Sequence, residues 1–314
     1  MSVFWFAFNG IAPLILLVLL GFFLKQIKLI DQTMIDQTTS FLFKVAFPVS
    51  LFNSINKIEI RDYFNPSLFI FAIGTIVGIV VLLMLILPRF VTGNKQRGAM
   101  IQGIYRGNYL LLGYPLAQNL FGESGVGPTA MLLPMVIFTY NVLAVFVLEY
   151  YRGEETKVNY LKVLIGLVKN PLIIGAIIGA VFSWSPWTLP VFLSRAVDDV
   201  GKIANPMALI MLGGQFSWNR LEGRISLLAW AISLREFIIP TLTTLAAVAL
   251  GFRGPELGAL FILFASPTAV TSFIMAKTMN SDSDLASQIV LGTTLISGFS
   301  LFLGVYTLRT LALI

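Results

Sequence analysis

The sequence predicts an all-α polytopic membrane protein of ten transmembrane helices, arranged as two inverted five-helix repeats with crossed, proline-broken fourth and ninth helices. Three observations support this fold class. Of the 314 residues, 57% are hydrophobic and only 11% are charged, whereas a soluble domain has about 25% charged residues. Ten apolar runs approach the roughly 20 residues that a helix needs to cross a bilayer. Two of these runs contain a proline among small and polar residues near their middle.

The ten predicted spans follow one another with short loops. The weakest patterns are those of the second span, which contains Lys44, and the seventh, which contains Asp198 and Asp199. The longest hydrophilic loop, residues 150–159, falls in mid-chain and divides it into repeats 1–153 and 154–314. The spans are predicted at residues 4–24, 38–55, 67–87, 98–121, 128–149, 163–183, 190–214, 225–250, 256–278 and 286–312.

The two halves carry prolines at matching places. Pro13 and Pro48 are 35 positions apart, as are Pro171 and Pro206, and each pair falls in the first two spans of its half. The broken fourth and ninth spans follow 67 and 61 positions later, at Pro115 and Pro267. Because each half has five spans, the second half enters the membrane from the opposite side. An odd-numbered repeat therefore gives an inverted repeat, which is typical of alternating-access transporters.

The distribution of Lys and Arg predicts the orientation, since cytoplasmic loops are enriched in both. With both termini outside, twelve of these residues fall in inner loops and six in outer segments, while Lys44, Arg106 and Arg235 lie within spans. Tryptophans at span ends on the outer face agree with this choice. The inner residues are Lys25, Lys28, Arg89, Lys95, Arg97, Arg152, Lys157, Lys162, Lys169, Arg220, Arg224 and Lys277; the outer ones are Lys57, Arg61, Arg195, Lys202, Arg253 and Arg309.

Composition also excludes classes of function. The chain has no Cys and no His, which excludes thiolate metal sites, disulfides and histidine proton relays. Its net charge of +6 comes from dispersed residues, so we expect lipid contact rather than nucleic-acid binding. Neither a nucleophile elbow nor a Walker A sequence occurs, and no metal-ligand cluster is visible. The expected protein is therefore no enzyme and has no cofactor. It is a secondary carrier or uniporter, with H⁺ or Na⁺ as a coupling ion if one is used.

The two broken spans predict a binding site. In the predicted topology they run in opposite directions, so their breaks meet near the midplane. A break creates a helix N-terminus with unpaired N–H groups and a partial positive charge, which suits an anion. A packing kink explains one such break equally well, but two at matched positions favour a site. The residues expected at the two ends are Gly113, Pro115, Ser266, Pro267 and Thr268.

Four nearby polar residues are further candidates. Arg106 lies ~12 Å along the fourth span from Gly98 at 1.5 Å per residue, and a charge at that depth needs an internal partner. A carboxylate substrate would serve, and so would a protein acid or carbonyl. Asn108 offers donors and acceptors. Tyr109 adds a hydroxyl, and Asn141 in the fifth span is either a ligand contact or a link between helices.

The seventh and eighth spans contain further charged residues. Asp198 and Asp199 are candidates for carrying a coupling proton or coordinating Na⁺, although an exposed outer helix end explains them better. Arg235 and Glu236 are adjacent and so do not face each other on a helix. Each needs another partner, and the sequence leaves their roles open, as it does for Lys44.

At these residues the sequence resembles the auxin efflux carrier family, which includes plant PIN-formed proteins and bacterial permeases for malate, malonate and similar acids. The matching stretches are Phe47–Phe52, Gly107–Asn108 with Gly113–Pro115, Asn205–Gly213, and Ser266–Ser272 with Ala276. The resemblance implies a scaffold domain and a transport domain, each drawn from both repeats, with the broken helices crossing at Pro115 and Pro267. It also implies an anion-contacting role for Asn108. The long central loop of the plant members is absent.

The sequence therefore predicts transport of a small organic anion by alternating access across a bacterial cytoplasmic membrane. The anion is expected to be a mono- or dicarboxylate such as malate or malonate, or an auxin-like acid. The alternative is a membrane sensor that binds a ligand at the same crossing without moving it. The lipid bilayer and the anion are the expected partners, and a homodimer is compatible with the sequence.

Overall fold

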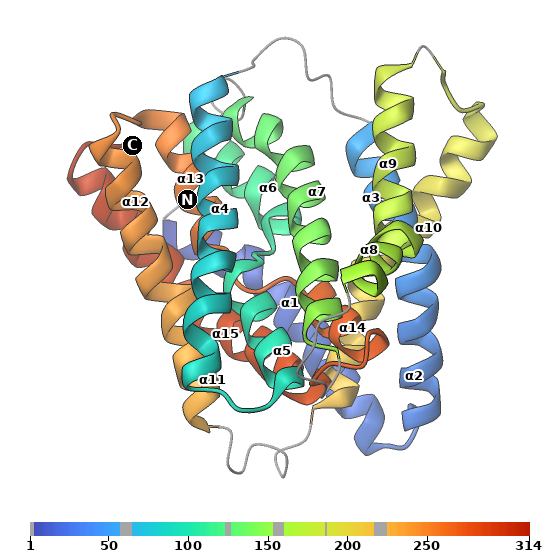
Figure 1. Cartoon of the computed structure of the whole chain (residues 1–314). Helices are drawn as coiled ribbons and strands as arrows, with labels where there is room; N and C mark the ends of the chain where they lie inside the picture. Colours follow the sequence, from blue (N-terminus) through green and yellow to red (C-terminus); the bar gives the residue numbers. More distant parts are fainter. Residues whose placement is uncertain (1–2, 57–64, 123–126, 153–159, 186, 217–224) are drawn as a thin grey trace.

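A computed structural model describes residues 3–56, 65–122, 127–152, 160–185, 187–216 and 225–314. Nearly all of these residues are helical, and within them the sole β-type pairing is one isolated bridge. Figure 1 shows a bundle of helices that run mostly along one common direction. The described part is thus a helical membrane-type fold, as the composition predicts.

The first half contains α1 to α7, and every span predicted there falls on a helix or a consecutive pair. The helix that leads into the second span begins at Gln32, six residues before the predicted start of that span, because Asp31 caps it by accepting from the Met34 N–H at 2.7 Å. A π-helical turn, Leu42–Ala46, joins its two parts. The helices are α1 (Val3–Gln26), α2 (Gln32–Phe41), α3 (Phe47–Asn56), α4 (Pro66–Ile86), α5 (Asn94–Tyr105), α6 (Tyr109–Phe121) and α7 (Gly127–Tyr150).

The second half contains α8 to α15 and follows the same plan. The sixth span, predicted as one helix, is interrupted at Asn170, whose side chain caps the next helix by accepting from the Leu172 N–H at 2.9 Å. Pro171 disfavours the helical conformation at Asn170. The helices are α8 (Tyr160–Lys169), α9 (Pro171–Trp184), α10 (Val191–Gln215), α11 (Ile225–Ser233), the π-helix η5 (Leu234–Ile238), α12 (Ile239–Ala249), α13 (Gly254–Ala265), α14 (Thr271–Thr278) and α15 (Ser283–Thr310).

Four stretches of the described residues are long and apolar enough to cross a membrane by length and composition: Pro66–Arg89, Gly127–Tyr150, Ile225–Ala249 and Ser283–Thr310. On two of them, large apolar side chains point outward; Leu85 on α4 is 63% exposed and Leu245 on α12 is 61% exposed. A soluble protein rarely exposes such rows of apolar side chains. These faces suit contact with lipid tails.

The right-hand part of Figure 1 contains α2, α3, α9 and α10, which are separated at the top from the larger group around α4, α6, α7, α12 and α13. Glycines bring helices of different halves into backbone contact. A side chain at Gly213 of α10 would place its Cβ 1.9 Å from the Val18 carbonyl oxygen of α1, and one at Gly175 of α9 would lie 2.5 Å from that of Pro48. Small residues at helix contacts are typical of membrane bundles.

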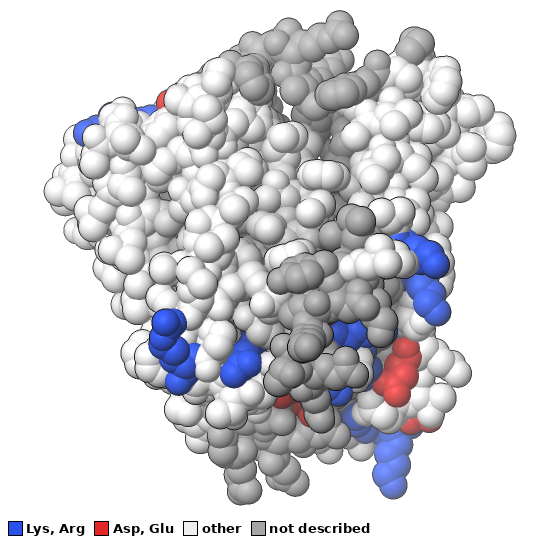
Figure 2. All heavy atoms as spheres, viewed as in Figure 1, with Lys and Arg blue, Asp and Glu red and all other residues white. Residues whose placement is uncertain are grey.

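Charged side chains are unevenly distributed on the face drawn in Figure 2. Most of the visible Lys and Arg side chains lie in the lower half, where α2, α5 and α14 lie, and a further group lies at the right edge near mid-height; most of the upper half is uncharged. A small group lies at the upper left. An uncharged band between two polar ends is the pattern expected of a chain that crosses a bilayer.

Candidate functional site

Two short breaks in helices meet at the centre of the fold. One separates α5 from α6 at residues 106–108, and the other separates α13 from α14 at residues 266–270. They pair as an antiparallel bridge: the Asn108 N–H donates to the Pro267 carbonyl at 2.7 Å, and the Ala269 N–H donates to the Arg106 carbonyl at 3.0 Å. Backbone groups that the breaks free from their helices therefore satisfy one another, as a low-dielectric interior requires.

Arg235 holds the C-terminal ends of α5 and α13 together. Its side chain is fully buried. Its Nε donates to the Ser266 carbonyl at 2.8 Å and its Nη1 donates to the Tyr105 carbonyl at 3.1 Å. Weaker contacts reach the carbonyls of Ile104 (3.3 Å) and Leu263 (3.5 Å), and Nη2 also donates to the Ser266 carbonyl. A cation at two helix C-termini interacts favourably with both dipoles.

The position of the first break corrects the prediction from sequence. Pro115 lies inside α6, well beyond the break, which is centred on Gly107. A Cβ at Gly107 would lie 2.0 Å from the Arg235 Nη2 atom. Only glycine leaves room for the guanidinium between the two helix ends. The crossing of the fourth and ninth spans is therefore centred on Gly107 and Thr268, so Pro267 takes part in it and Pro115 does not.

The N-terminal ends of α6 and α14 border a small cavity. Neither helix has a side-chain cap at its N-terminus, so their first N–H groups keep their partial positive charge. The cavity has a volume of about 50 Å³, room for a few water molecules at roughly 10–15 Å³ each. It is lined by Phe47, Ser50, Leu51, Arg106, Gly107, Asn108, Tyr109, Ile137, Tyr140, Asn141, Leu172, Asn205, Ala269, Val270 and Thr271.

Arg106 is buried beside this cavity without a carboxylate partner in the described part of the chain. It is 4% exposed. Its Nη2 donates to Asn141 Oδ1 at 2.8 Å, and its Nη1 contacts the Met275 sulfur at 2.7 Å. Both partners are uncharged, so the positive charge of Arg106 is not neutralised by them. Asn141 is itself fixed, since its Nδ2 donates to the Ile137 carbonyl at 2.8 Å.

Of the nine predicted binding residues, the structure brings four to the cavity: Arg106, Asn108, Tyr109 and Asn141. The hydroxyls of Ser266 and Thr268 instead donate to the carbonyls of Ile262 and Gly103, each at 2.6 Å. They stabilise the crossing rather than face the cavity.

Three predicted residues remain, and three residues that line the cavity were not predicted. Pro267 takes part through its carbonyl oxygen, while Gly113 and Pro115 lie within α6, away from the break. Ser50, Asn205 and Thr271 line the cavity but were not predicted as ligands. All three fall in the stretches that carry the family resemblance, and that resemblance could have indicated them as candidates.

Comparison with known proteins identifies the family of this chain. A family model described as membrane transport protein matches residues 6–305. The chain belongs to this family, the auxin efflux carrier family of membrane transporters. The resemblance seen in the sequence is thus confirmed, and the members of this family are transporters rather than enzymes.

Individual relatives support the same family. An uncharacterized transporter of Methanocaldococcus jannaschii is 24% identical over 89% of this chain and 92% of its own length. A putative malonate transporter of Rhizobium meliloti is 22% identical over 96% of each chain. A probable auxin efflux carrier component of rice is 25% identical, over 42% of this chain and 25% of its own length.

In this transporter, the two aspartates predicted as coupling-ion candidates lie on α10, away from the crossing. The side chain of Asp199 is 75% exposed and pairs with Lys202 at 3.2 Å. Asp198 is partly buried, and neither residue borders the cavity. Asp199 thus fits the exposed helix end that the sequence also allowed.

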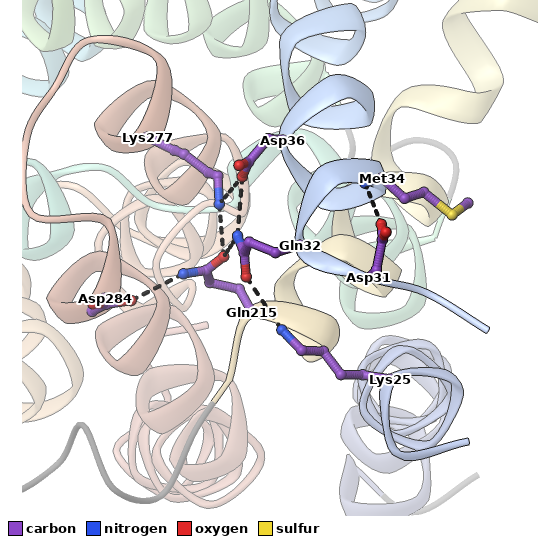
Figure 3. A network of polar contacts seen from close by, with 8 residues as sticks. All are labelled: Lys25, Asp31, Gln32, Met34, Asp36, Gln215, Lys277 and Asp284. Atoms are coloured by element: carbon purple, nitrogen blue, oxygen red, sulfur yellow. Dashed lines mark hydrogen bonds and ion pairs between the residues drawn. The ribbon is translucent and has the colours of Figure 1, made fainter. Parts of the chain in front are cut away.

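A polar network joins five helices at the lower end of the transporter (Figure 3). Lys277 of α14 pairs with Asp36 of α2 at 2.8 Å and donates to Gln215 Oε1 of α10 at 2.7 Å. Gln32 donates to both Asp36 and Gln215, at 3.0 and 3.2 Å. Gln215 donates to Asp284 of α15 at 3.0 Å, and Lys25 of α1 donates to Gln32 at 3.3 Å.

The ionisation of Asp36 reflects this network. Partial burial acts to raise the pKa of its carboxyl, but hydrogen bonds from Lys277 and Gln32 and the charges of Lys277 and Lys25 act against it. Together they hold the pKa below its usual value of 3.8. Asp36 is therefore ionised at neutral pH, and the ion pair with Lys277 is present there.

A second, larger cavity lies between α1, α11 and α15. Its volume is about 330 Å³, and its lining is apolar apart from Gln288 and Thr294. Val18, Phe22 and Leu291 contribute to its wall. With no charged residue in this lining, it does not suit a small anion.

Proposed function

We propose that this protein is a secondary carrier or uniporter that moves a small organic anion, a mono- or dicarboxylate such as malonate, across the cytoplasmic membrane by alternating access. The observation that carries the proposal is the cavity at the crossing. Two uncapped helix N-termini and the buried Arg106 border it together. Each favours negative charge, and in a low-dielectric interior their effects are weakly screened.

The proposed binding mode uses groups that the structure leaves available. A carboxylate accepts two parallel hydrogen bonds from a guanidinium, and Arg106 already presents two of its nitrogens to neutral partners near the cavity. Asn108 is the N-cap residue of α6, and its side chain makes no cap hydrogen bond there; in the proposed mode its amide donates to the anion. The Thr271 hydroxyl, at the start of α14, is a further donor.

The proposed architecture is ten spans in two inverted repeats, residues 1–153 and 154–314, with both termini outside. Helix packing supports it. Glycine contacts join α1 to α10 and α3 to α9, which are the first span with the seventh and the second with the sixth. A pseudo-two-fold axis that exchanges the halves exchanges these two pairs. An axis of this kind also relates the fourth span to the ninth, and the bridge between residues 107 and 268 supports that relation.

We assign the polar network of Figure 3 as the closure on the cytoplasmic side. It joins α1, α2 and α10 to α14 and α15, at the end where the Lys and Arg side chains gather. Movement of α14 away from α2 breaks the pair between Asp36 and Lys277. Opening toward the cytoplasm therefore needs these contacts to separate, whereas the crossing itself stays intact.

Removing one partner of this closure should loosen it. Asp36→Asn is expected to increase amide hydrogen exchange in residues 32–41 and 271–278, measured by mass spectrometry on the detergent-solubilised protein. Asp199→Asn is the matched control, because it also removes an aspartate–lysine pair but at a site exposed to solvent. Equal exchange in the Asp36→Asn variant and the parent protein would show that the network closes nothing.

Flux through reconstituted liposomes tests the proposed function. Purified protein in liposomes loaded with unlabelled malonate should take up labelled malonate well above the rate of protein-free liposomes. Related mono- and dicarboxylates in the external medium should compete. The sensor hypothesis predicts binding without flux, which a thermal-shift assay with the same acids would detect, since a ligand of the folded state raises apparent stability. Binding without uptake would therefore replace the carrier with the sensor.

A further inference from the structure

Glu236 is a buried acidic residue that does not line the cavity at the crossing and has no role in the proposed binding mode. It lies in the π-helical turn η5, next to Arg235, and is 2% exposed. Its Oε2 accepts a hydrogen bond from the Ser300 hydroxyl of α15 at 2.6 Å, whereas its Oε1 has no hydrogen-bond partner among the described residues. Acidic residues inside a membrane span are rare and mark functional sites by default, and single π-helical turns occur frequently at such sites.

The contacts of Glu236 fit both of its protonation states. When the carboxyl is ionised, the Ser300 hydroxyl donates to Oε2. When it is protonated, Oε2–H donates to the Ser300 oxygen, whose own hydrogen turns to the Ser297 carbonyl, 3.3 Å away. A hydroxyl can donate in one direction and accept from another. The proton can therefore bind and leave without a large movement of heavy atoms.

The surroundings supply a single charge close to this carboxyl. The helices packed against η5 are α5, α11, α12, α13 and α15, and Arg235 is the charged group that acts on Glu236. The α11 and α12 segments contain no charged residue. The other three helices contact η5 at Ile104, Leu263 and Ser300. Apart from Tyr105 at the crossing, their charged and titratable residues lie about 9 Å or more along the helix from these contacts, at 1.5 Å per residue. These residues are Lys95, Arg97, Glu256, Asp284, Tyr306 and Arg309.

The charges buried in the described part of the chain are those of Arg106, Arg235 and Glu236. With Glu236 ionised they leave one net positive charge, which a monoanion neutralises. With Glu236 protonated they leave two, which a dianion such as malonate neutralises. Because uncompensated charge inside a membrane protein is costly, the proton and the second negative charge stabilise each other.

We propose that Glu236 is a proton-binding site whose occupancy is linked to the charge of the anion at the crossing, so that a dicarboxylate enters together with a proton. This inference rests on the proposed transport function. The proton binds one oxygen of the carboxylate from water on one side of the membrane and leaves to water on the other. No other bond forms or breaks.

Glu236→Gln tests the proposal because glutamine mimics the protonated carboxyl and can still accept from Ser300. Malonate affinity is measured by calorimetry on the detergent-solubilised protein from neutral to mildly alkaline pH, where malonate is a dianion. In the parent protein the affinity should fall by about tenfold for each pH unit above the pKa of the site, whereas in Glu236→Gln it should stay high and independent of pH. Glu149→Gln, at an ion pair with Arg152 near the C-terminal end of α7, should retain the dependence of the parent. Loss of affinity in Glu236→Gln, or an unchanged pH dependence, would overturn the linkage.

Infrared spectroscopy without any anion separates this proposal from the proposed function. The absorption band of a protonated carboxyl should decline as the pH rises in the parent protein and in Glu149→Gln, and the declining component should be absent in Glu236→Gln. If malonate binds to none of the variants, the transport of malonate and its linkage to the proton are refuted together. The infrared titration still decides whether Glu236 binds a proton, and an identical band in Glu236→Gln would refute that.

Discussion

Arg235→Met is expected to destabilise the protein more than any substitution in the cavity itself. The change removes the donors to the carbonyls of Ile104, Tyr105, Leu263 and Ser266, and it leaves Glu236 without its neighbouring charge. Breaking a buried charged contact of this kind typically costs about 3–5 kcal/mol. At roughly 2–4 °C per kcal/mol, the apparent melting temperature in detergent should fall by about 10 °C.

Two further variants give this prediction its controls. Arg235→Lys keeps the charge but replaces the planar fork with a point charge, so an intermediate melting temperature is expected. Arg195→Met removes an exposed arginine of α10 and should melt within about 1–2 °C of the parent, since surface changes usually stay within ±0.5 kcal/mol. A melting temperature for Arg235→Met equal to that of Arg195→Met would contradict the assigned role of Arg235 at the two helix ends.

Arg106→Ala is expected to abolish most of the affinity for malonate while leaving the fold intact. Truncating one side of a buried, hydrogen-bonded charge pair costs about 2–5 kcal/mol of binding energy, which corresponds to a loss of roughly 30-fold to several thousand-fold in affinity. Asn108→Ala should have a smaller effect, because a neutral hydrogen bond contributes about 0.5–1.5 kcal/mol. Calorimetric titration of each purified variant measures both effects.

The matched control for the Arg106 variant is Lys169→Ala, which removes one positive charge from the exposed end of α8. It should bind malonate as the parent does. Circular dichroism and melting temperature should show that Arg106→Ala remains folded, because its partners Asn141 and Met275 are neutral. Unchanged affinity in both the Arg106→Ala and Asn108→Ala variants would disprove the assigned site.

Local sequence patterns predicted where the helices lie and which segments are broken. Apolar runs mark the helices because lipid contact demands them, and the stretch around Pro267 correctly predicts the second break. The break at Asn170 was equally readable from Pro171, although the sixth span was predicted as continuous. The positions of Arg106, Asn108 and Asn141 beside the cavity could be predicted, because a polar side chain inside an apolar span is costly and usually faces the protein interior or a cavity.

What the sequence could not show depends on contacts between distant residues. Pro115 was the more conspicuous signal in the fourth span, but the break forms at Gly107 because Arg235, about 130 residues away, occupies the space beside it. The closure between Asp36 and Lys277 joins residues that no local pattern relates. The same is true of Glu236, whose partner Ser300 lies 64 positions further along the chain.

Chemical protection of one cavity residue tests the proposed anion site most directly. The chain has no cysteine, so Ser50→Cys, which lies in the cavity lining, introduces a single thiol. Thr92→Cys places a thiol at an exposed position between α4 and α5 as the control. Both proteins are treated in liposomes with a small maleimide, with and without a panel of acids that includes malonate and malate.

At least one acid of the panel should slow modification at position 50 by about tenfold or more at saturation, which corresponds to ~90% occupancy of the site, and leave position 92 unaffected. Adding Arg106→Ala to the Ser50→Cys protein should remove the protection. Equal rates of modification at position 50 with and without every acid in the panel would contradict an anion site at the crossing of the two broken helices.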